Sequence, residues 1–144
     1  MKPILFPSVL FAAALSLFSL TAHADDLAAM EGKWKPESAE AGGKPIDVPQ
    51  LRDLIITITG DRYEVQTNEG PDRGTLKLDE KTTPKTMDAT DTEGQDAGKV
   101  IKAIYELKDD TMRVCYAING GERPSTFTTA EGAPFLVVVY RREK

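Results

Sequence analysis

The chain has 144 residues, with 18 basic and 23 acidic side chains, a formal net charge of −5, one histidine and one cysteine. A lone cysteine excludes an intrachain disulfide, and one histidine is too few for the usual zinc sites. The acidic balance argues against nucleic acid or an anionic membrane surface as the main partner, because the one basic cluster is Arg141, Arg142 and Lys144.

Residues 1–24 have the pattern of a cleaved export signal. Lys2 supplies a positive start, an apolar run extends over residues 4–20, and residues 22–24 have the small-x-small sequence that a signal peptidase cuts. The alternative is a retained membrane anchor, because the apolar run is close to the roughly 20 residues that a spanning helix needs. Pro7 interrupts that run and two aspartates follow the cleavage sequence directly, so we predict cleavage and no stable membrane anchor.

Cleavage would leave a mature domain of residues 25–144 in the periplasm or outside the cell. It would also remove His23, the only histidine, and with it Ser-His-Asp and Cys-His chemistry. Cys115 then has no base to activate it. It is either a buried thiol or a thiol that pairs with another molecule, and its apolar neighbours Val114 and Tyr116 favour burial. We therefore expect no enzymatic activity and no cofactor.

In chain order, residues 25–30 begin with an aspartate and predict one short helical turn. The chain after them has the patterns of β-strands, most clearly in the β-branched run 54–59 and in the alternating apolar residues of 100–107 and 111–118. Residues 40–50 carry two glycines and two prolines and predict a long loop, with a second helical turn at 49–53. The eight predicted strands cover residues 32–37, 54–59, 62–67, 74–79, 85–90, 100–107, 111–118 and 134–141.

The spacing of these strands predicts the fold class. Turn signals recur about every 8–12 residues, as in β-sandwiches and β-barrels, and consecutive strands joined by short turns favour an antiparallel meander. Closing such a meander removes its two exposed edges. We predict one all-β domain: a small eight-stranded antiparallel up-and-down barrel with a short N-terminal helical turn.

The sequence Gly32-Lys33-Trp34, at the start of the first predicted strand, is similar to the opening of lipocalin-like barrels. In those barrels the tryptophan plugs one end, and an arginine from the last strand covers it. The resemblance implies that Trp34 is the barrel plug and that Arg141 is its cover, with Arg142 as the alternative.

Five further stretches match in order along the chain: Gly74-Thr75-Leu76-Lys77-Leu78-Asp79, Pro84-Lys85-Thr86-Met87-Asp88, Ile104-Tyr105-Glu106-Leu107, Arg113-Val114-Cys115-Tyr116-Ala117 and Arg123-Pro124-Ser125-Thr126-Phe127. With the opening tripeptide they resemble an uncharacterised lipocalin-like domain family described chiefly from planctomycete proteomes, over nearly the whole mature chain. The resemblance implies a small eight-stranded barrel that is often exported and has no established enzymatic activity, cofactor or ligand. It carries over no catalytic residue.

The predicted strands also hold residues that we expect to line an interior pocket. These candidate ligand-binding residues are Ile56, Ile58, Tyr63, Tyr105, Val114 and Tyr116. Their apolar surface suits an apolar ligand, and the tyrosine hydroxyls can orient it. The alternative is that the same side chains fill the barrel, because eight strands enclose only enough space for side chains or one small ligand.

The densest patch of carboxylates is Asp88, Asp91, Glu93 and Asp96. Carboxylates in a loop can bind Ca²⁺, and a facing pair can perform acid–base chemistry. The spacing differs from that of an EF-hand loop, so an acidic, solvated turn is the simpler interpretation. We predict no metal site and no catalytic residue.

Two functions from different classes remain. The first is an exported, non-enzymatic binding protein that holds a small apolar ligand inside the barrel, in a void open at the end opposite Trp34. The second is a protein-interaction module, such as an inhibitor of an exported hydrolase, with a filled barrel and an exported protein partner bound at loops 40–50 or 120–129. The frequency of ligand binding among barrels of this type favours the first, by analogy of fold.

Overall fold

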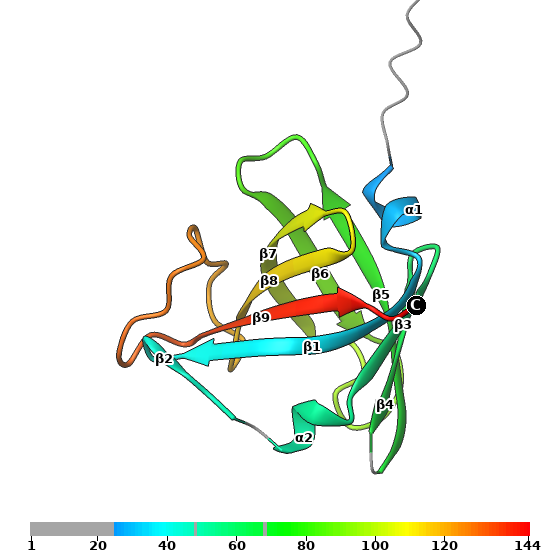
Figure 1. Ribbon diagram of the computed structural model, residues 1–144, viewed down its shortest axis with the longest axis horizontal. Coiled ribbons are helices and arrows are strands. Elements are labelled where there is room, and N and C mark those ends of the chain that lie inside the picture. Colours follow the sequence, from blue (N-terminus) through cyan, green and yellow to red (C-terminus); the bar gives the residue numbers. More distant parts are fainter. Residues whose placement is uncertain (1–24, 48, 68) are drawn as a thin grey trace, which may run out of the picture.

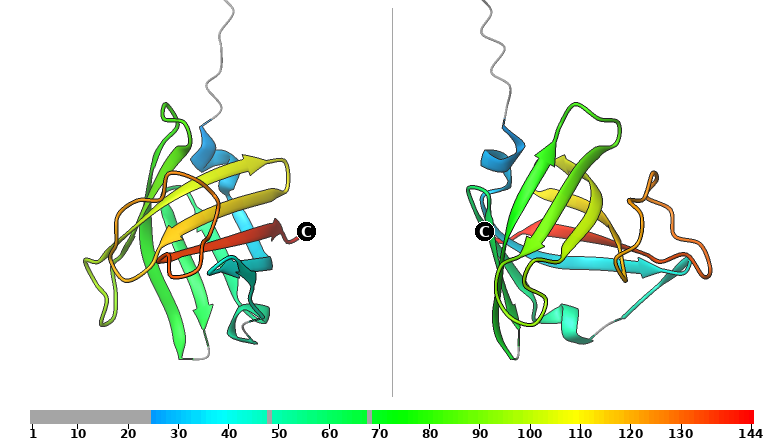
Figure 2. Two further views of the ribbon diagram at one scale, coloured as in Figure 1. Left: turned by 90° about the vertical axis from the view of Figure 1, so that its left-hand side faces the viewer. Right: turned by 180° about the vertical axis from the view of Figure 1, so that it is seen from behind.

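The computed structural model describes residues 25–47, 49–67 and 69–144, so the predicted export signal lies outside the described residues. The elements are α1 (Asp26–Met30), β1 (Gly32–Ala41), β2 (Lys44–Pro45), α2 (Pro49–Arg52), β3 (Ile55–Thr59), β4 (Arg62–Thr67), β5 (Gly70–Asp79), β6 (Lys85–Asp91), β7 (Val100–Lys108), β8 (Thr111–Ala117) and β9 (Phe135–Arg142). Strands β1 and β3 to β9 pair antiparallel in succession, and β1 also pairs with β9, which closes the barrel (Figure 1, Figure 2). The predicted all-β, eight-stranded antiparallel barrel is confirmed.

Two strands extend into regions that the sequence pattern assigned to turns or loops. β1 continues to Ala41 and then turns through Gly42 and Gly43 into β2, so part of the predicted loop 40–50 is a hairpin. Both glycines have a positive φ (61° and 75°), a conformation that is costly for other residues. β5 begins at Gly70 rather than at residue 74, because its pairing with β4 continues to the last residue of that strand, Thr67.

Alternate residues of the strands point into the barrel and form the main core. This core is built from aliphatic, methionine and tyrosine side chains, including Ile58, Leu76, Met87, Met112, Val114, Val138 and Tyr140. Full burial of one large apolar side chain contributes about 1.5–3 kcal/mol, so these residues supply most of the stabilisation that closes the barrel.

A second, smaller apolar cluster lies on the outside of the barrel. Ile104, Cys115 and Val137 are direct neighbours on β7, β8 and β9, and all three are buried. Phe127, from the loop 118–134, packs against them. Burial raises the pKa of the Cys115 thiol above its ordinary value, so the thiol stays protonated, which disfavours a role as a nucleophile.

Arg123 holds the loop 118–134 against the outside of the barrel through hydrogen bonds and an ion pair. Its guanidinium donates hydrogen bonds to one carbonyl of β6 at 3.1 Å and one of β7 at 2.8 Å, and it pairs with Asp88 at 2.5 Å. At the far end of the loop, the Thr129 hydroxyl donates to Glu40 at 2.7 Å. The loop is therefore an ordered segment held at two separate points.

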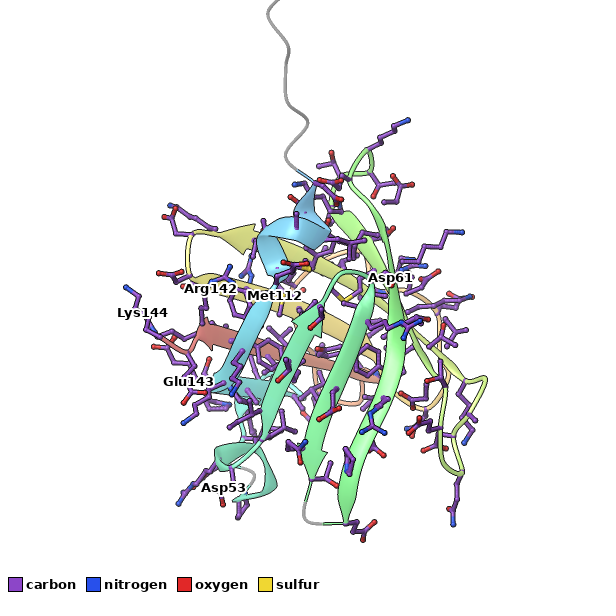
Figure 3. All side chains as sticks on the ribbon, turned by 90° about the vertical axis from the view of Figure 1, so that its right-hand side faces the viewer. Asp53, Asp61, Met112, Arg142, Glu143 and Lys144 are labelled. Atoms are coloured by element: carbon purple, nitrogen blue, oxygen red, sulfur yellow. The ribbon has the colours of Figure 1, made fainter. Side chains whose placement is uncertain are left out.

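Helix α1 closes one end of the barrel. Met30 and Trp34 are fully buried, and the Trp34 indole N–H donates to the Met30 carbonyl at 2.8 Å. The Arg142 guanidinium lies over the indole ring, 4.3 Å from its centroid, and donates to the carbonyls of Ala29 and Glu31. Figure 3 shows Arg142 near the end of β9, on the side of the barrel where α1 lies. A cation over an aromatic face and charged hydrogen bonds to backbone carbonyls join the first and last elements of the domain.

The arginine that covers Trp34 is Arg142, which corrects the assignment to Arg141. Trp34 and Arg142 are directly paired across β1 and β9, so their side chains lie on the same face. Arg141 points outward, where it pairs with Glu37 at 3.2 Å and its side chain is 62% exposed. Because side chains alternate along a strand, an error of one residue exchanges the inside and the outside of the barrel.

A buried polar contact also holds α1 in place. The Asp26 carboxylate accepts hydrogen bonds from the Lys85 ammonium at 2.8 Å and from the Tyr105 hydroxyl at 2.7 Å. Burial works against ionisation of Asp26, but these bonds outweigh it and hold the pKa of the carboxyl below its ordinary value. Burial and the bond to Asp26 raise the pKa of Tyr105, so its hydroxyl remains a donor.

Candidate functional site

A cavity of about 340 Å³ lies inside the barrel and opens at the end opposite α1. This volume is at the lower end of the roughly 300–1,000 Å³ typical of small-molecule sites. The wall is mostly aliphatic and aromatic, whereas the exposed residues Thr67, Asp72 and Ile101 mark the mouth. The barrel is therefore closed and packed at one end, and hollow and apolar at the other.

Five of the six predicted ligand-binding residues lie in the wall of this cavity: Ile56, Ile58, Tyr63, Val114 and Tyr116. Tyr105 is outside the lining, because its fully buried side chain is bonded to Asp26 at the closed end. Alternation along β7 correctly predicts that Tyr105 faces inward, but it does not indicate at which height along the barrel axis the side chain lies. A ligand-binding role for the other five stays a prediction.

Several further wall residues were not among the predicted ones: Leu76, Met87, Ala89, Met112 and Tyr140. A signal existed for Met112, which alternates in step with Val114, and for Tyr140, which alternates in step with Val138. Asp72 and Asp91 also line the cavity, and no apolar pattern could have indicated them.

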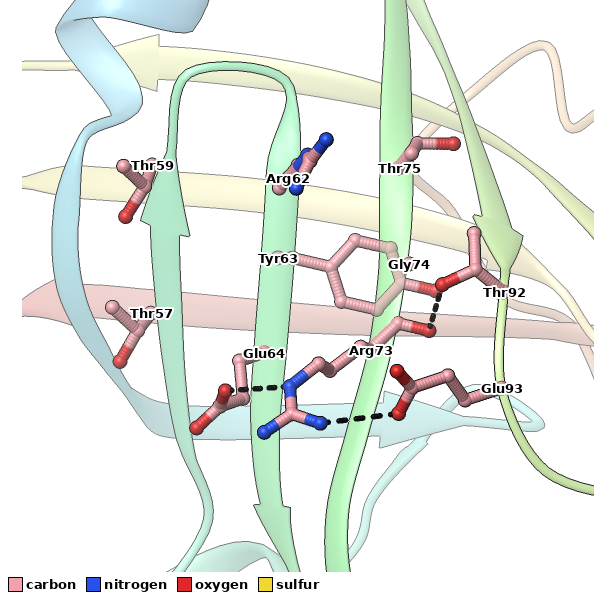
Figure 4. A pocket seen from close by; sticks show the side chains of 10 residues that line it. All are labelled: Thr57, Thr59, Arg62, Tyr63, Glu64, Arg73, Gly74, Thr75, Thr92 and Glu93. Carbon is pink, nitrogen blue, oxygen red and sulfur yellow. Dashed lines mark hydrogen bonds and ion pairs between the residues drawn. The ribbon is translucent and has the colours of Figure 1, made fainter.

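A glycine lets one tyrosine reach across a neighbouring strand. Tyr63, Gly74 and Asp91 are paired in one row across β4, β5 and β6. The Tyr63 ring extends over Gly74 (Figure 4), and its hydroxyl donates a hydrogen bond to the Asp91 carboxylate. Burial, this bond and the negative charge of Asp91 raise the pKa of Tyr63, so the hydroxyl stays protonated and keeps Asp91 in position.

Two more tyrosines place neutral polar groups in the wall. The hydroxyls of Tyr116 and Tyr140 are 2.9 Å apart and share a hydrogen bond. Burial raises the pKa of Tyr116 to about 12 and raises that of Tyr140 as well. Both hydroxyls are therefore protonated at neutral pH, and the wall can donate or accept a hydrogen bond without gaining charge there.

The predicted carboxylate patch does not converge on one point. Asp88 pairs with Arg123 at 2.5 Å, Glu93 with Arg73 at 3.2 Å and Asp96 with Lys99 at 2.5 Å, whereas Asp91 accepts from Tyr63. Within the described residues no group of three or more histidine, cysteine, aspartate or glutamate side chains is placed to hold a metal ion. Each carboxylate has a different partner, which fits a structural role better than acid–base chemistry.

A second hollow, of about 560 Å³, lies on the outer face of β3, β4 and β5 (Figure 4). Arg73 crosses it and pairs with Glu64 at 3.0 Å and with Glu93 at 3.2 Å. Most of its lining is threonine or charged, and the paired side chains are each more than a third exposed. A ligand here would compete with ion pairs and with water, so the interior cavity is the stronger candidate site.

No protein-family model matches this sequence, and a search of curated proteins found no match either. The resemblance to the lipocalin-like family therefore stays a prediction. Among the described residues, no helix has both the length and the apolar character needed to cross a bilayer.

Proposed function

We propose that this protein is an exported, non-enzymatic binding protein that holds a small, largely apolar ligand in the open half of the barrel. The observation that carries the proposal is the apolar cavity of about 340 Å³, open at one end and closed at the other by Trp34 and α1. Native interiors are normally packed to the density of organic crystals, so an apolar hollow of this size, open at one end, provides space that a small ligand can occupy.

The rim of the barrel supports the same interpretation. Val100, Ile101 and Ile118 are 44%, 36% and 37% exposed, and all three border a hollow beside the cavity mouth, the rim hollow. Exposed apolar side chains at the entrance of an apolar cavity extend the surface that a ligand can cover. Removing apolar surface from water contributes about 25 cal/mol per Å², so both the wall and the rim would favour an apolar ligand.

The proposal includes export through residues 1–24 and membership of the lipocalin-like family. The position of Trp34 beneath Arg142 supports that membership, because the resemblance implies a tryptophan plug covered by an arginine from the last strand. The separate partners of Asp88, Glu93 and Asp96 support a non-enzymatic role.

Native mass spectrometry tests the proposal on protein released by an exporting bacterial host and purified without denaturation. We expect a reproducible extra mass that is lost on denaturation. An Ala89→Leu variant should lose most of it, because Ala89 lines the cavity and a larger side chain would occupy the space. An Ala28→Leu variant on the exposed surface of α1 introduces the same side chain outside the cavity and should keep the extra mass.

An extra mass that both variants retain equally would place the ligand outside the cavity. A clean protein mass from several preparations, including one from the native organism, would count against a carried ligand.

The second candidate function is a protein-interaction module that binds an exported partner through its loops. It is supported by the ordered loop 118–134, which Arg123 and Thr129 hold at two points while many of the residues between them are exposed. The open cavity does not fit the filled barrel that this function predicts. A clean mass in the experiment above would therefore favour this candidate.

A further inference from the structure

The charged side chains that line the cavity are all negative. Asp72, from β5, and Asp91, at the end of β6, line it together with apolar and neutral side chains, and the lining contains no lysine or arginine. Among the described residues, neither aspartate lies within ion-pair distance of a basic side chain. Asp88, Glu93 and Asp96 differ, because each has a basic partner at 3.2 Å or less.

Asp91 occupies the position from which a carboxylate can bind a ligand. It lines both the interior cavity and the rim hollow, so it stands at the boundary between the apolar interior and solvent. One carboxylate oxygen accepts the hydrogen bond from Tyr63, which holds the group in a fixed orientation. A carboxylate held in this way loses little conformational entropy when a ligand binds.

The one basic side chain of the rim hollow does not cancel this charge. Lys99 borders the hollow, but its ammonium pairs with Asp96 at 2.5 Å and its side chain is 71% exposed. The mouth and rim therefore have three carboxylates, Asp72, Asp91 and Asp96, against a single ammonium. The surplus negative charge lies at the entrance of an apolar hollow, where an incoming cation is attracted and an incoming anion is repelled.

We propose, on the basis of the binding function above, that the ligand is an amphipathic amine whose ammonium group binds Asp91 at the mouth while its apolar part lies in the cavity. An ammonium donates a charge-assisted hydrogen bond to a carboxylate, which is about twice as strong as a bond between neutral groups. The rings of Tyr63 and Tyr116 line the same cavity and attract a cation to their faces. A fatty acid of the same length would place its carboxylate beside Asp91 and Asp72, which is unfavourable.

Binding of three probes with equal chain length tests the proposal: octylamine, octanol and octanoate, titrated by calorimetry into the full chain as an exporting host releases it. We expect octylamine to bind about tenfold or more tightly than octanol, because it adds a hydrogen bond between two charged groups. Octanoate should bind most weakly. Added salt should reduce the differences in affinity between the three probes, since it screens charges at an exposed mouth.

An Asp91→Asn variant separates charge from shape. The amide oxygen still accepts the Tyr63 hydrogen bond, so the row across β5 is preserved, whereas the negative charge is removed. In this variant octylamine should lose most of its advantage over octanol. The control is Asp109→Asn, which makes the same charge change in the exposed turn between β7 and β8, where φ is +52° and asparagine is well tolerated. It should leave all three affinities unchanged.

The outcomes distinguish the ligand class from the proposed function. Equal binding of octylamine and octanol, or tightest binding of octanoate, would overturn the amine proposal while leaving an apolar binding site. An advantage of octylamine that survives in Asp91→Asn would also overturn it, because the ammonium would then lie elsewhere. If none of the three probes binds, both the amine proposal and the cavity function are contradicted.

Discussion

Gly74→Ala should disrupt the barrel at the point where the Tyr63 ring crosses β5. A Cβ atom at position 74 would lie less than 3.0 Å from the Tyr63 ring, the Tyr63 hydroxyl and the carbonyl oxygen of Thr90. The Thr90 carbonyl is backbone and cannot rotate away, so β5 and β6 must shift apart locally, and the Tyr63 ring must also move. Its hydrogen bond to Asp91 would then be lost.

The expected loss of stability follows from these two effects. Forcing extra volume into a packed site costs about 1–3 kcal/mol. Loss of a hydrogen bond to a charged group costs about 1.5–3 kcal/mol more. We therefore expect the free energy of unfolding to fall by about 2.5–6 kcal/mol, a large part of the roughly 5–15 kcal/mol that holds a typical domain together.

Urea unfolding monitored by circular dichroism and by Trp34 fluorescence measures this loss. Gly121→Ala is the matched control, because the nearest atom to its new Cβ is 3.5 Å away, in ordinary contact. Its effect should lie between zero and a gain of about 1 kcal/mol, since alanine restricts the unfolded chain. In a Tyr63→Leu background, Gly74→Ala should cost at least about 1 kcal/mol less than in the parent. A cost for Gly74→Ala below about 1 kcal/mol, or full additivity with Tyr63→Leu, would refute the proposed crossing.

Two further predictions concern the closed end and the tyrosines. Arg142→Ala should lower the free energy of unfolding by about 2–4 kcal/mol, because it removes charged hydrogen bonds to α1 and the cation above Trp34. Arg141→Ala should change that free energy by less than about 0.5 kcal/mol. Equal effects of the two substitutions in urea unfolding would contradict the conclusion that Arg142 covers Trp34. All four tyrosines have a raised pKa in the folded state, so ultraviolet absorbance should show no phenolate near pH 10 until the protein unfolds. The unfolded chain releases these protons at lower pH than the folded chain does, so the free energy of unfolding should fall as the pH rises above about 10. An absorbance change from tyrosine ionisation near pH 10 in the folded protein would contradict this prediction.

The strands were predictable because their signal is local. β3 is a run of β-branched residues, and β8 alternates Met112, Val114 and Tyr116 toward one face. Period-two burial needs no knowledge of distant contacts, and turn residues between the runs mark the ends. The eight-stranded barrel follows from these local signals together with the rule that exposed edges are removed.

The outer cluster was less predictable, because its residues on β7 and β8 stand among the charged, outward-facing residues Lys102, Glu106 and Arg113. Ala103 and Tyr105 face the interior, whereas Ile104 and Cys115 lie beneath Phe127 of the loop 118–134. Alternation along a strand identifies the face that points inward, but it does not indicate which outward residues another segment covers. Only the position of a loop that is distant in sequence from β7 settles which outward residues are covered.

The candidate site was also predictable only in part from the sequence. The sequence alone determined that apolar and tyrosine side chains would face a common interior, since alternation along each strand is a property of the backbone. The tertiary structure decided that Tyr105 belongs to the closed end. It also decided that Arg142 rather than Arg141 covers Trp34. Finally, it placed Asp91 at the mouth, where no described basic side chain pairs with it. These facts depend on the stagger between strands, which sets the height of each residue along the barrel axis. That stagger arises from closure of β1 onto β9, a contact between the two ends of the domain that no local pattern encodes.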